Sequence, residues 1–344
     1  MDPFDDLLRG VRADGAVFGR SVLAPPWALR FTDRAAMTLL VPLHGEGWIA
    51  HPQDAGRPRP LRVGEVAIVR GPEPFVFADE TGTAARPGTP RDVRCGGAPG
   101  ERGDPGGGGN PGGPGGPGGR RGPGGRGEPD GRTVLMAGAY HVRGEVPRRL
   151  LRVLPPVVVV ADDHDCAPLR DYFELQLAEG RHGRQIVLDR LLDWLLVCTL
   201  RDWFDRPEAD SPAWYRALGD DTVGPVLRAM HEAPDRPWTL ASLAAVAGVS
   251  RTTLAKRFAE LVGEPPLAYL TDWRMALAAD LLAEPAATVT SVARRVGYAD
   301  AFGFSSAFKR VRGVSPSTYR AEVSAAGAHP GEQPGAGARL RESR

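Results

Sequence analysis

The sequence predicts a two-domain chain: an N-terminal β-barrel with following α-helices, and a C-terminal all-α domain built from two similar helix pairs. Three observations predict this division. Short runs rich in β-branched and aromatic residues, bounded by Gly, Pro and Asp, occupy residues 15–160. From Ile186 onward, apolar residues recur every three or four positions, which is the helical period. A repeat with a period of 50 residues then occupies the C-terminal part of the chain.

Composition and charge exclude several other classes of protein. The 344 residues include 43 Lys and Arg against 42 Asp and Glu, and the start, Met1-Asp-Pro-Phe-Asp-Asp, is acidic where a secretory signal is basic. The longest apolar run, residues 153–161, is much shorter than the ~20 residues that span a bilayer. The 3 cysteines form no CxxC pair, which excludes a disulfide scaffold and a zinc ribbon. We therefore expect a cytoplasmic protein with no membrane partner.

The strands of the barrel are predicted from the β-rich runs. These runs lie at residues 37–43, 47–50, 61–69, 75–77, 133–142 and 150–160. Between the fourth and fifth runs, residues 96–131 contain 19 Gly and 7 Pro and hardly any large apolar side chain, so they cannot bury a core. A collagen-like triplet frame holds only from Gly113 to Gly125, which is too short for a triple helix. We expect residues 96–131 to be a disordered insertion in a barrel domain that spans residues 1–165.

A strongly apolar helix is predicted from Ile186 to Phe204, inside a helical linker that spans residues 166–224. Its apolar positions are too numerous for one buried stripe. Part of the helix should therefore pack on the barrel. For the remaining face two hypotheses stay open: contact with a second subunit in a homodimer, or a wholly intramolecular helix.

Each copy of the repeat has the pattern of a helix, a glycine turn and a second helix. Both copies contain Ala-x3-Gly and end in Phe-x4-Gly-x2-Pro-x2-Tyr. The alanine lets two helices approach closely, and the glycine ends the first helix in a left-handed backbone conformation. Helix-turn-helix units are therefore predicted at about residues 240–261 and 289–312, with a connecting helix at residues 267–282. The side chains expected to face inward are Leu254, Phe258, Leu261, Val292, Val296, Phe304 and Phe308.

The matched copies also carry a family resemblance. The second copy contains Gly297-Tyr298, Phe308-Lys-Arg, Gly313, Pro316 and Tyr319-Arg320. With this pattern, residues 225–322 resemble the DNA-binding domain of the AraC/XylS family of transcription regulators. The resemblance implies two recognition helices in successive major grooves of double-stranded DNA, ~34 Å apart. It implies a sequence-specific transcription regulator, with RNA polymerase as a further partner if the protein is an activator.

The recognition helices of such a domain are expected to begin at the caps Ser250 and Asp300. The candidate DNA-binding residues are Ser250, Arg251, Thr252, Thr253, Lys256 and Arg257 in the first unit, and Asp300, Ala301, Gly303, Ser305, Ser306, Lys309 and Arg310 in the second. The first helix combines cations with hydroxyl groups, whereas small residues occupy the tip of the second. We therefore expect the first helix to supply more of the sequence discrimination.

The N-terminal domain resembles the cupin-type sensor domain of many members of that family. The similar segments are residues 40–48, 61–75 and 134–140. The resemblance implies a barrel that senses an effector, by default a small molecule. One hypothesis is an effector pocket lined by Trp27, His44, Trp48, Phe75, Phe77 and Tyr140, and the other is that these aromatic residues are ordinary core.

Two alternative functions follow from the same domain. A metal-dependent cupin enzyme fused to a DNA-binding domain would need two or three His and a Glu around one ion. The sequence has His44 and Glu46 on one strand, but Phe75 stands where a second His is expected. We therefore expect no metal site, no cofactor, no catalytic residue and no enzyme activity. The other alternative is a cysteine-based oxidant sensor through Cys95, which stands beside Arg94.

A disordered tail is expected over residues 323–344, where Gly, Ala and Pro are again frequent.

The glycine-rich insertion allows the first test. Deleting residues 98–130 should leave the unfolding midpoint and the binding of operator DNA unchanged, because long insertions in loops add little closure entropy. Thermal denaturation and DNA titration of the shortened and full chains measure both quantities. A shortened chain with a lower midpoint would contradict the expectation.

Overall fold

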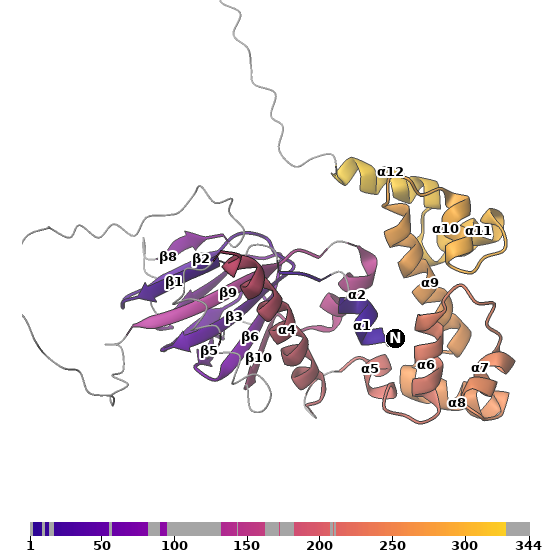
Figure 1. Ribbon diagram of the computed structural model, residues 1–344, viewed down its shortest axis with the longest axis horizontal. Coiled ribbons are helices and arrows are strands. Elements are labelled where there is room, and N and C mark those ends of the chain that lie inside the picture. Colours follow the sequence, from indigo (N-terminus) through magenta and orange to yellow (C-terminus); the bar gives the residue numbers. More distant parts are fainter. Residues whose placement is uncertain are drawn as a thin grey trace, which may run out of the picture. The chain divides into compact units, whose positions relative to one another are not determined.

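Strands are followed by helices along the chain in the computed structural model (Figure 1), as the sequence predicts. The structure describes residues 3–8, 11–13, 17–54, 57–81, 90–94, 132–142, 144–161, 172, 182–206, 209 and 211–327. The predicted insertion at residues 96–131, Cys95, Cys166 and the predicted tail beyond Gly327 lie outside these residues. Within the described ranges, no helix is long and apolar enough to cross a membrane.

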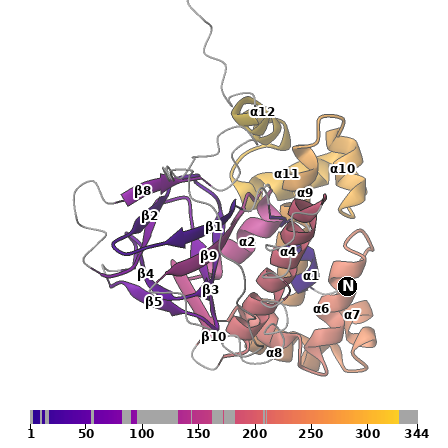
Figure 2. The same ribbon diagram turned by 60° about the vertical axis from the view of Figure 1, so that its left-hand side comes forward.

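Two five-stranded sheets face each other in the N-terminal half (Figures 1 and 2). The first sheet has the order β1 (Val17–Leu23), β9 (Thr133–Tyr140), β3 (Met37–His44), β6 (Glu65–Arg70) and β10 (Val157–Ala161). The second has the order β5 (Arg59–Arg62), β4 (Glu46–Ala50), β7 (Phe75–Ala78), β2 (Ala28–Phe31) and β8 (Pro90–Val93). Neighbouring strands are antiparallel except β2 and β8, which are parallel.

Alternate side chains of both sheets fill a shared core, because successive residues of a strand point to opposite faces. Leu40, Leu135 and Val157 enter it from the first sheet, and Ile49 and Phe77 enter it from the second. These side chains are at most 5% exposed. The predicted β-barrel with following helices is therefore confirmed.

Two of the predicted strand runs are wrong in part. The run at residues 61–69 is divided into β5 and β6, because Gly64 turns the chain with a φ of 92°. Residues 150–153 are not a strand: they end the helix α2 (Glu145–Val153). Val146 and Leu150, four positions apart, are both buried, which is helical spacing, and two prolines separate α2 from β10.

The apolar helix expected at residues 186–204 is α4 (Arg184–Phe204), and it packs on the first sheet. A Cβ atom placed on Gly138 of β9 would lie 2.7 Å from Leu192 Cδ1, so a larger residue at position 138 would collide with the helix. On the opposite face of α4, Ile186 is 66% exposed and Trp194 is 53% exposed. The predicted contact of α4 with the barrel is present, and contact with a second subunit stays a prediction.

Helices make up the rest of the described chain. They are α5 (Ala213–Ala217), α6 (Val223–Glu232), α7 (Leu240–Val246), α8 (Arg251–Val262), α9 (Pro266–Leu282), α10 (Val289–Arg295), α11 (Ala301–Arg312) and α12 (Pro316–Gly327). The pairs α7–α8 and α10–α11, and the connecting helix α9, lie where the repeat predicts them. Helix α12 continues to Gly327, so residues 323–327 are helical although they were expected to begin a disordered tail.

The two helix pairs have the same type of N-terminal cap and the same type of glycine turn. In each, a threonine caps the first helix in a reciprocal box with the serine three residues later, Thr239 with Ser242 and Thr288 with Ser291. The turns pass through Gly248 and Gly297, whose φ values are 67° and 81°. The copies therefore agree in the chemistry of their turns as well as in their apolar spacing.

Each helix pair has its own apolar core, and α9 contributes to both. Leu254 and Phe258 pack with Leu270 of α9 in the first core. In the second core, Phe304 and Phe308 pack with Met275 of α9. The predicted inward side chains at positions 254, 258, 292, 296, 304 and 308 are all fully buried, and Leu261 is partly buried.

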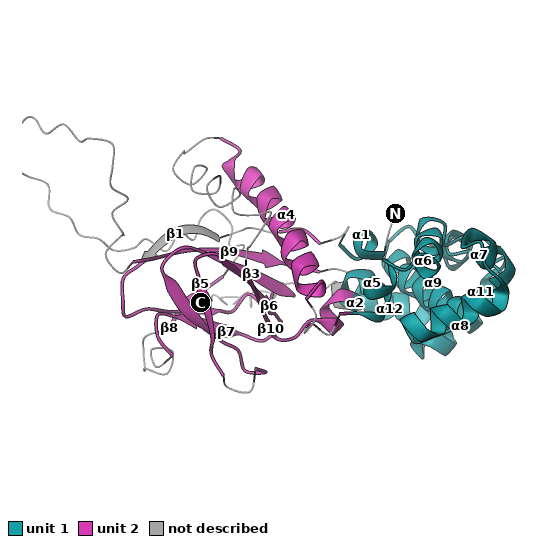
Figure 3. Ribbon diagram, turned by 90° about the horizontal axis from the view of Figure 1, so that it is seen from below, with its two compact units in different colours: residues 1–9, 144–149, 212–344 teal, residues 10–143, 150–211 magenta. Residues whose placement is uncertain are grey.

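The chain folds into two compact units (Figure 3). The barrel unit comprises residues 10–143 and 150–211, and the helical unit comprises residues 1–9, 144–149 and 212–344. The helical unit thus includes two short segments from the N-terminal half, one of which contains the helix α1 (Pro3–Leu8). The predicted domain boundaries at residues 165 and 225 do not indicate this grouping, and they stay predictions.

These two segments cover a third face of α9. Leu7 and Val146 pack with Trp273 and Ala276 in a separate apolar cluster. Beside it, the His231 ring stacks on Trp273 with centroids 4.1 Å apart. His231 Nδ1 lies 2.8 Å from Asp6 Oδ2, and His231 Nε2 lies 2.9 Å from the Tyr269 hydroxyl. A buried polar chain therefore connects α1, α6 and α9.

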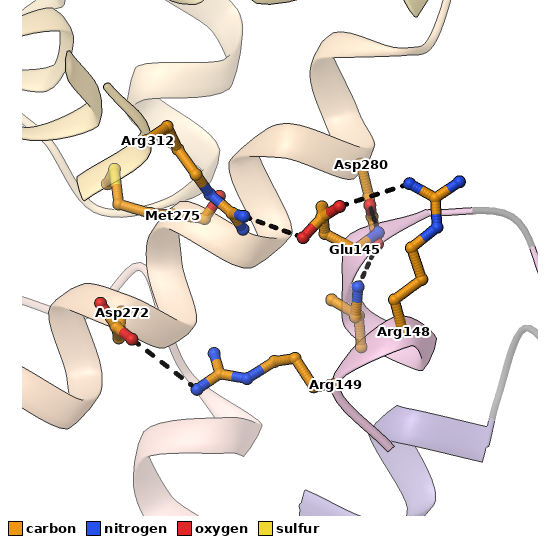
Figure 4. Close-up of polar contacts among 8 residues, drawn as sticks. Glu145, Arg148, Arg149, Asp272, Met275, Asp280 and Arg312 are labelled. Atoms are coloured by element: carbon orange, nitrogen blue, oxygen red, sulfur yellow. Dashed lines mark hydrogen bonds and ion pairs between the residues drawn. The ribbon is translucent and has the colours of Figure 1, made fainter. Parts of the chain in front are cut away.

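Hydrogen bonds and an ion pair connect the first turn of α2 to other helices of the helical unit (Figure 4). The Asp280 carboxylate of α9 accepts hydrogen bonds from the backbone N–H groups of Glu145 and Val146, the latter at 3.1 Å. Glu145 in turn accepts a bond from Arg312, the last residue of α11, at 2.8 Å. Burial raises the pKa of Asp280, although the two backbone bonds oppose the rise. The α2 turn is thus bound to both α9 and α11.

Gly144 allows the start of α2 to lie close to the Asp280 carboxylate. Its φ is 99°, in the left-handed region that side chains disfavour, and a Cβ atom there would lie 2.7 Å from Asp280 Oδ1. A larger residue would be strained and would displace the carboxylate.

Replacing Asp280 by alanine should destabilise the helical unit by about 1–3 kcal/mol, because two buried backbone N–H groups lose their acceptor. Chemical denaturation of the full chain measures the change. Asp272→Ala is the matched control on the same helix: Asp272 is half exposed and lies 3.9 Å from Arg149. That substitution should change stability by less than about 0.5 kcal/mol. Equal unfolding midpoints for the two variants would contradict the role given to Asp280.

Candidate nucleic-acid interface

The second helix of each pair presents a polar face to solvent. In α8 the exposed side chains include Arg251, Thr252, Lys256 and Arg257. In α11 they are Phe302, Ser306, Lys309 and Arg310. The candidate DNA-binding residues of the sequence analysis all lie on these two helices or at their caps.

The start of α8 is held by hydroxyl groups. The Ser250 hydroxyl accepts the backbone N–H of Thr253 at 3.1 Å, and its oxygen lies 2.8 Å from Thr253 Oγ1. The predicted cap is therefore present, and both hydroxyls take part in it. Arg251 and Thr252 point to solvent on the first turn, where a recognition helix reaches base edges. Lys256 lies one turn further along, with its Nζ 3.9 Å from Glu260.

Arg257 is held by a carboxylate outside its helix. Its Nε and Nη2 atoms donate to Asp220 Oδ2 at 3.1 and 2.8 Å. Asp220 also accepts the backbone N–H groups of Thr222 and Val223. Burial raises the pKa of Asp220, but the bonds from these N–H groups and from Arg257 outweigh it and hold the pKa below its ordinary value. Arg257 is therefore fixed in place, with its charge balanced within the protein.

The start of α11 is held by Asp300. Its Oδ1 atom accepts the backbone N–H groups of Phe302 and Gly303 at 2.9 and 2.8 Å, as the predicted cap requires. The Ser305 hydroxyl donates to the Ala301 carbonyl at 2.7 Å, inside the helix. The outward face of α11 therefore consists of Phe302, followed by a serine and two cations at positions 306, 309 and 310.

The sequence analysis did not include Phe302 among the candidates, although its side chain is 83% exposed. A signal was present. Phe304 and Phe308 face the core, and residue 302 lies about 200° around the helix from residue 304 at 100° per residue. An aromatic residue at that position has to point outward.

The six residues proposed for an effector pocket do not form one cluster. Trp27, Phe75 and Phe77 lie together in the barrel core, with the Trp27 and Phe77 rings 5.2 Å apart. Tyr140 lies on the other face of its strand, because the alternate residues of β9 fill the core. Burial raises the pKa of Tyr140, and the negative charges of α4 raise it further. By the same alternation, Trp48 faces away from the core that Ile49 enters. His44 is half buried at the end of β3.

A pocket of about 600 Å³ lies elsewhere in the barrel unit. It is lined by Arg59, Pro60, Glu65, Val153, Leu154, Pro155, Val157, Val159 and Trp203. The strands β5, β6 and β10, the last residue of α2 with the two residues that follow it, and the end of α4 supply these residues. The residues of the predicted effector pocket do not line it, and the sequence analysis did not single out its tryptophan.

The candidate metal ligands and cysteines can be compared with their surroundings in the described part of the chain. No group of three or more His, Cys, Asp and Glu side chains is arranged there to hold a metal ion. Glu46, half of the pair considered for a metal site, lies 3.2 Å from the Arg62 guanidinium. Cys198 is buried in α4, and the proposed sensor Cys95 is not among the described residues.

Comparisons with known proteins match both halves of the chain. A cupin family model matches residues 2–205, and a helix-turn-helix domain model matches residues 243–322. A putative AraC-like transcription regulator from Streptomyces lividans is 37% identical over 190 residues, which are 54% of this chain and 62% of that protein. The RCS-specific HTH-type transcriptional activator RclR from Escherichia coli K12 is 39% identical over 101 residues, which are 29% of this chain and 36% of that protein.

The chain thus spans less than two thirds of the length of these relatives. A solved structure, the DNA-binding domain of the global transcriptional factor AdpA in complex with a target DNA, is 32% identical with a TM-score of 0.31. It covers 32% of this chain and 100% of that domain. The cupin model spans more than half of the chain. The chain therefore belongs to the cupin family, with a helix-turn-helix domain of the AraC type after its cupin domain.

Proposed function

We propose that this protein is a sequence-specific DNA-binding transcription regulator whose barrel senses an effector. The observation that carries the proposal is the pair of helix-turn-helix units joined by α9, each with an exposed polar face on its second helix. The AraC-type domain and the names of the relatives support it. The partner is double-stranded DNA, and contact with RNA polymerase is expected if the protein activates transcription.

The contacts within the helical unit refine the roles of the candidate residues. We propose that Arg251 and Thr252, which are exposed on the first turn of α8, read base edges. We propose that Lys309 and Arg310, exposed near the end of α11, contact phosphates. Arg257 acts as a positioning residue because Asp220 binds it. Ser250 and Asp300 hold the helix starts, and Ala301, Gly303 and Ser306 border the same surface.

Selection of bound fragments from genomic DNA should return sites with two parts, about one helical turn apart. Arg251→Ala should relax the preferred bases in one part and cost about 1–3 kcal/mol, whereas Lys309→Ala should weaken all sequences alike and lower the salt slope by about one. Arg228→Ala, which removes an exposed arginine of α6, outside both helix-turn-helix units, is the control. Fragments with no shared sequence would refute the proposal.

We propose the 600 Å³ pocket as the effector site. Trp203 offers a flat indole, and Val157 and Val159 offer a branched apolar wall. Its two charged residues already have partners: Arg59 is bound to Asp54 at 2.8 Å, and Glu65 accepts the backbone N–H of Arg62 at 2.7 Å. The pocket therefore suits a largely apolar, uncharged ring compound that carries a hydrogen-bonding group.

Helix α2 provides a route from this pocket to the recognition helices. Its last residue, Val153, lines the pocket, and its first residue, Glu145, is ion-paired with Arg312 at the end of α11. A ligand that shifts the end of α2 would act on this pair. Trp203, near the end of α4, lines the same pocket. A homodimer through the exposed face of α4, with Ile186, Val187 and Trp194, stays a further proposal.

A thermal-shift screen with neutral aromatic compounds tests the pocket. A bound compound should raise the unfolding midpoint of the wild type. At a concentration of a hundred times its Kd, it should add about 2.7 kcal/mol to the free energy of unfolding. The shift should vanish in Trp203→Ala and persist in Trp194→Ala, which removes the exposed tryptophan of the same helix. Glu145→Gln should keep the shift but lose the effect of the compound on operator affinity. A shift that persists in Trp203→Ala would exclude the pocket.

A further inference from the structure

We propose that Phe302 makes the second recognition helix a reader of thymine, through contact of its phenyl ring with the C5-methyl group in the major groove. The inference rests on the proposed function, because it requires that α11 binds DNA. It names the base that α11 recognises, which the polar side chains of the helix leave open.

The exposure of Phe302 has no explanation in folding. Of the three phenylalanines of α11, Phe304 and Phe308 are completely buried, whereas Phe302 is 83% exposed. An exposed phenyl ring forfeits the transfer free energy that burial would supply. Its neighbours are Ala301 and Gly303, which are small, so the ring protrudes by itself from the first turn of the helix.

The position of Phe302 on the helix is that of a base-reading residue. Side chains four, seven and eight positions later share its face, and these are Ser306, Lys309 and Arg310. The first turn of a recognition helix contacts base edges, and cations further along contact phosphates. In the first copy of the repeat, the same position is occupied by Thr252, which is also exposed.

The cap fixes the backbone from which the Phe302 ring projects. Asp300 accepts the backbone N–H groups of both Phe302 and Gly303, so these two donors are not available to a phosphate. The start of α11 therefore presents a side chain to DNA, and the side chain at its tip is apolar. In the major groove only thymine carries a methyl group, and phenylalanine is among the side chains that contact it.

Gly303, the residue after Phe302, leaves open space at the start of α11. A Cβ atom at this position would meet only the Asp300 carboxylate, at 3.6 Å and beyond, which is ordinary van der Waals contact. Its φ is not among the positive values, so the backbone does not require glycine. A glycine inside a helix is less stable than alanine. The missing side chain leaves room beside Phe302 for close approach of a base pair.

The test uses the full chain and the operator recovered by fragment selection. Each thymine is replaced in turn by deoxyuridine, which lacks only the C5-methyl group. For the wild type, one replacement in the part of the site bound by α11 should weaken binding about fourfold, the equivalent of one buried methyl group. Phe302→Ala should bind the thymine operator at that weaker level and show no further loss with deoxyuridine at this position. Phe302→Leu should keep part of the discrimination.

Two further variants sharpen the result. Leu267→Ala removes another exposed apolar side chain of the helical unit, outside both helix-turn-helix units, and should retain wild-type affinity and discrimination. Gly303→Ala should raise the unfolding midpoint and yet weaken operator binding. Because Phe302 is exposed, the circular dichroism spectrum of Phe302→Ala should match that of the wild type.

Other outcomes overturn the inference. If Phe302→Ala weakens binding while deoxyuridine has no effect at any position, the ring acts as a wedge between base steps. If Phe302→Ala binds as the wild type does but fails in transcription, the ring contacts another protein. Both results leave the proposed function intact. A wild-type chain that selects no sequence would refute the proposed function, and the inference with it.

Discussion

The helix α9 is the element on which the rest of the helical unit depends, because it has apolar contacts in three directions. Leu270 belongs to the core of the first helix pair, Met275 to that of the second, and Trp273 to the cluster formed with residues 1–9 and 144–149. With 17 residues at 1.5 Å each, α9 is about 25 Å long. It sets the separation of α8 and α11, and both pairs lose part of their apolar core if it is displaced.

The features predicted from the sequence are those with local or periodic causes. The inward phenylalanines follow the helical period, the glycine turns need left-handed backbone, and the caps Ser250 and Asp300 act within three residues of themselves. Each cause is present twice in the chain, once per copy of the repeat. The outward direction of Phe302 follows from the same period. Its exposure was therefore available to sequence reasoning, even though the residue was not included among the candidates.

The unpredicted features depend on residues that are distant in sequence and form no pattern. Asp280 and Glu145 are 135 positions apart, and His231 and Asp6 are 225 apart. Nothing next to these residues indicates their partners. The pocket has the same origin, since Arg59 and Trp203 both line it although they are far apart in the sequence. For the proposed aromatic pocket, strand alternation would have separated Tyr140 from the residues of β9 that fill the core, had the register been known.

The bond between Arg257 and Asp220 has a consequence for how affinity depends on salt. A protein that neutralises DNA phosphates releases condensed counterions, and the released ions make binding weaker as salt rises. Arg257 already has a carboxylate 2.8 Å away. If α8 enters the major groove as proposed, this arginine would displace few ions from the DNA, and it would orient the helix without a corresponding increase in nonspecific attraction. Since the whole chain carries a formal charge of only +1, such internal neutralisation would, under the proposed function, favour discrimination among sequences over nonspecific binding to DNA.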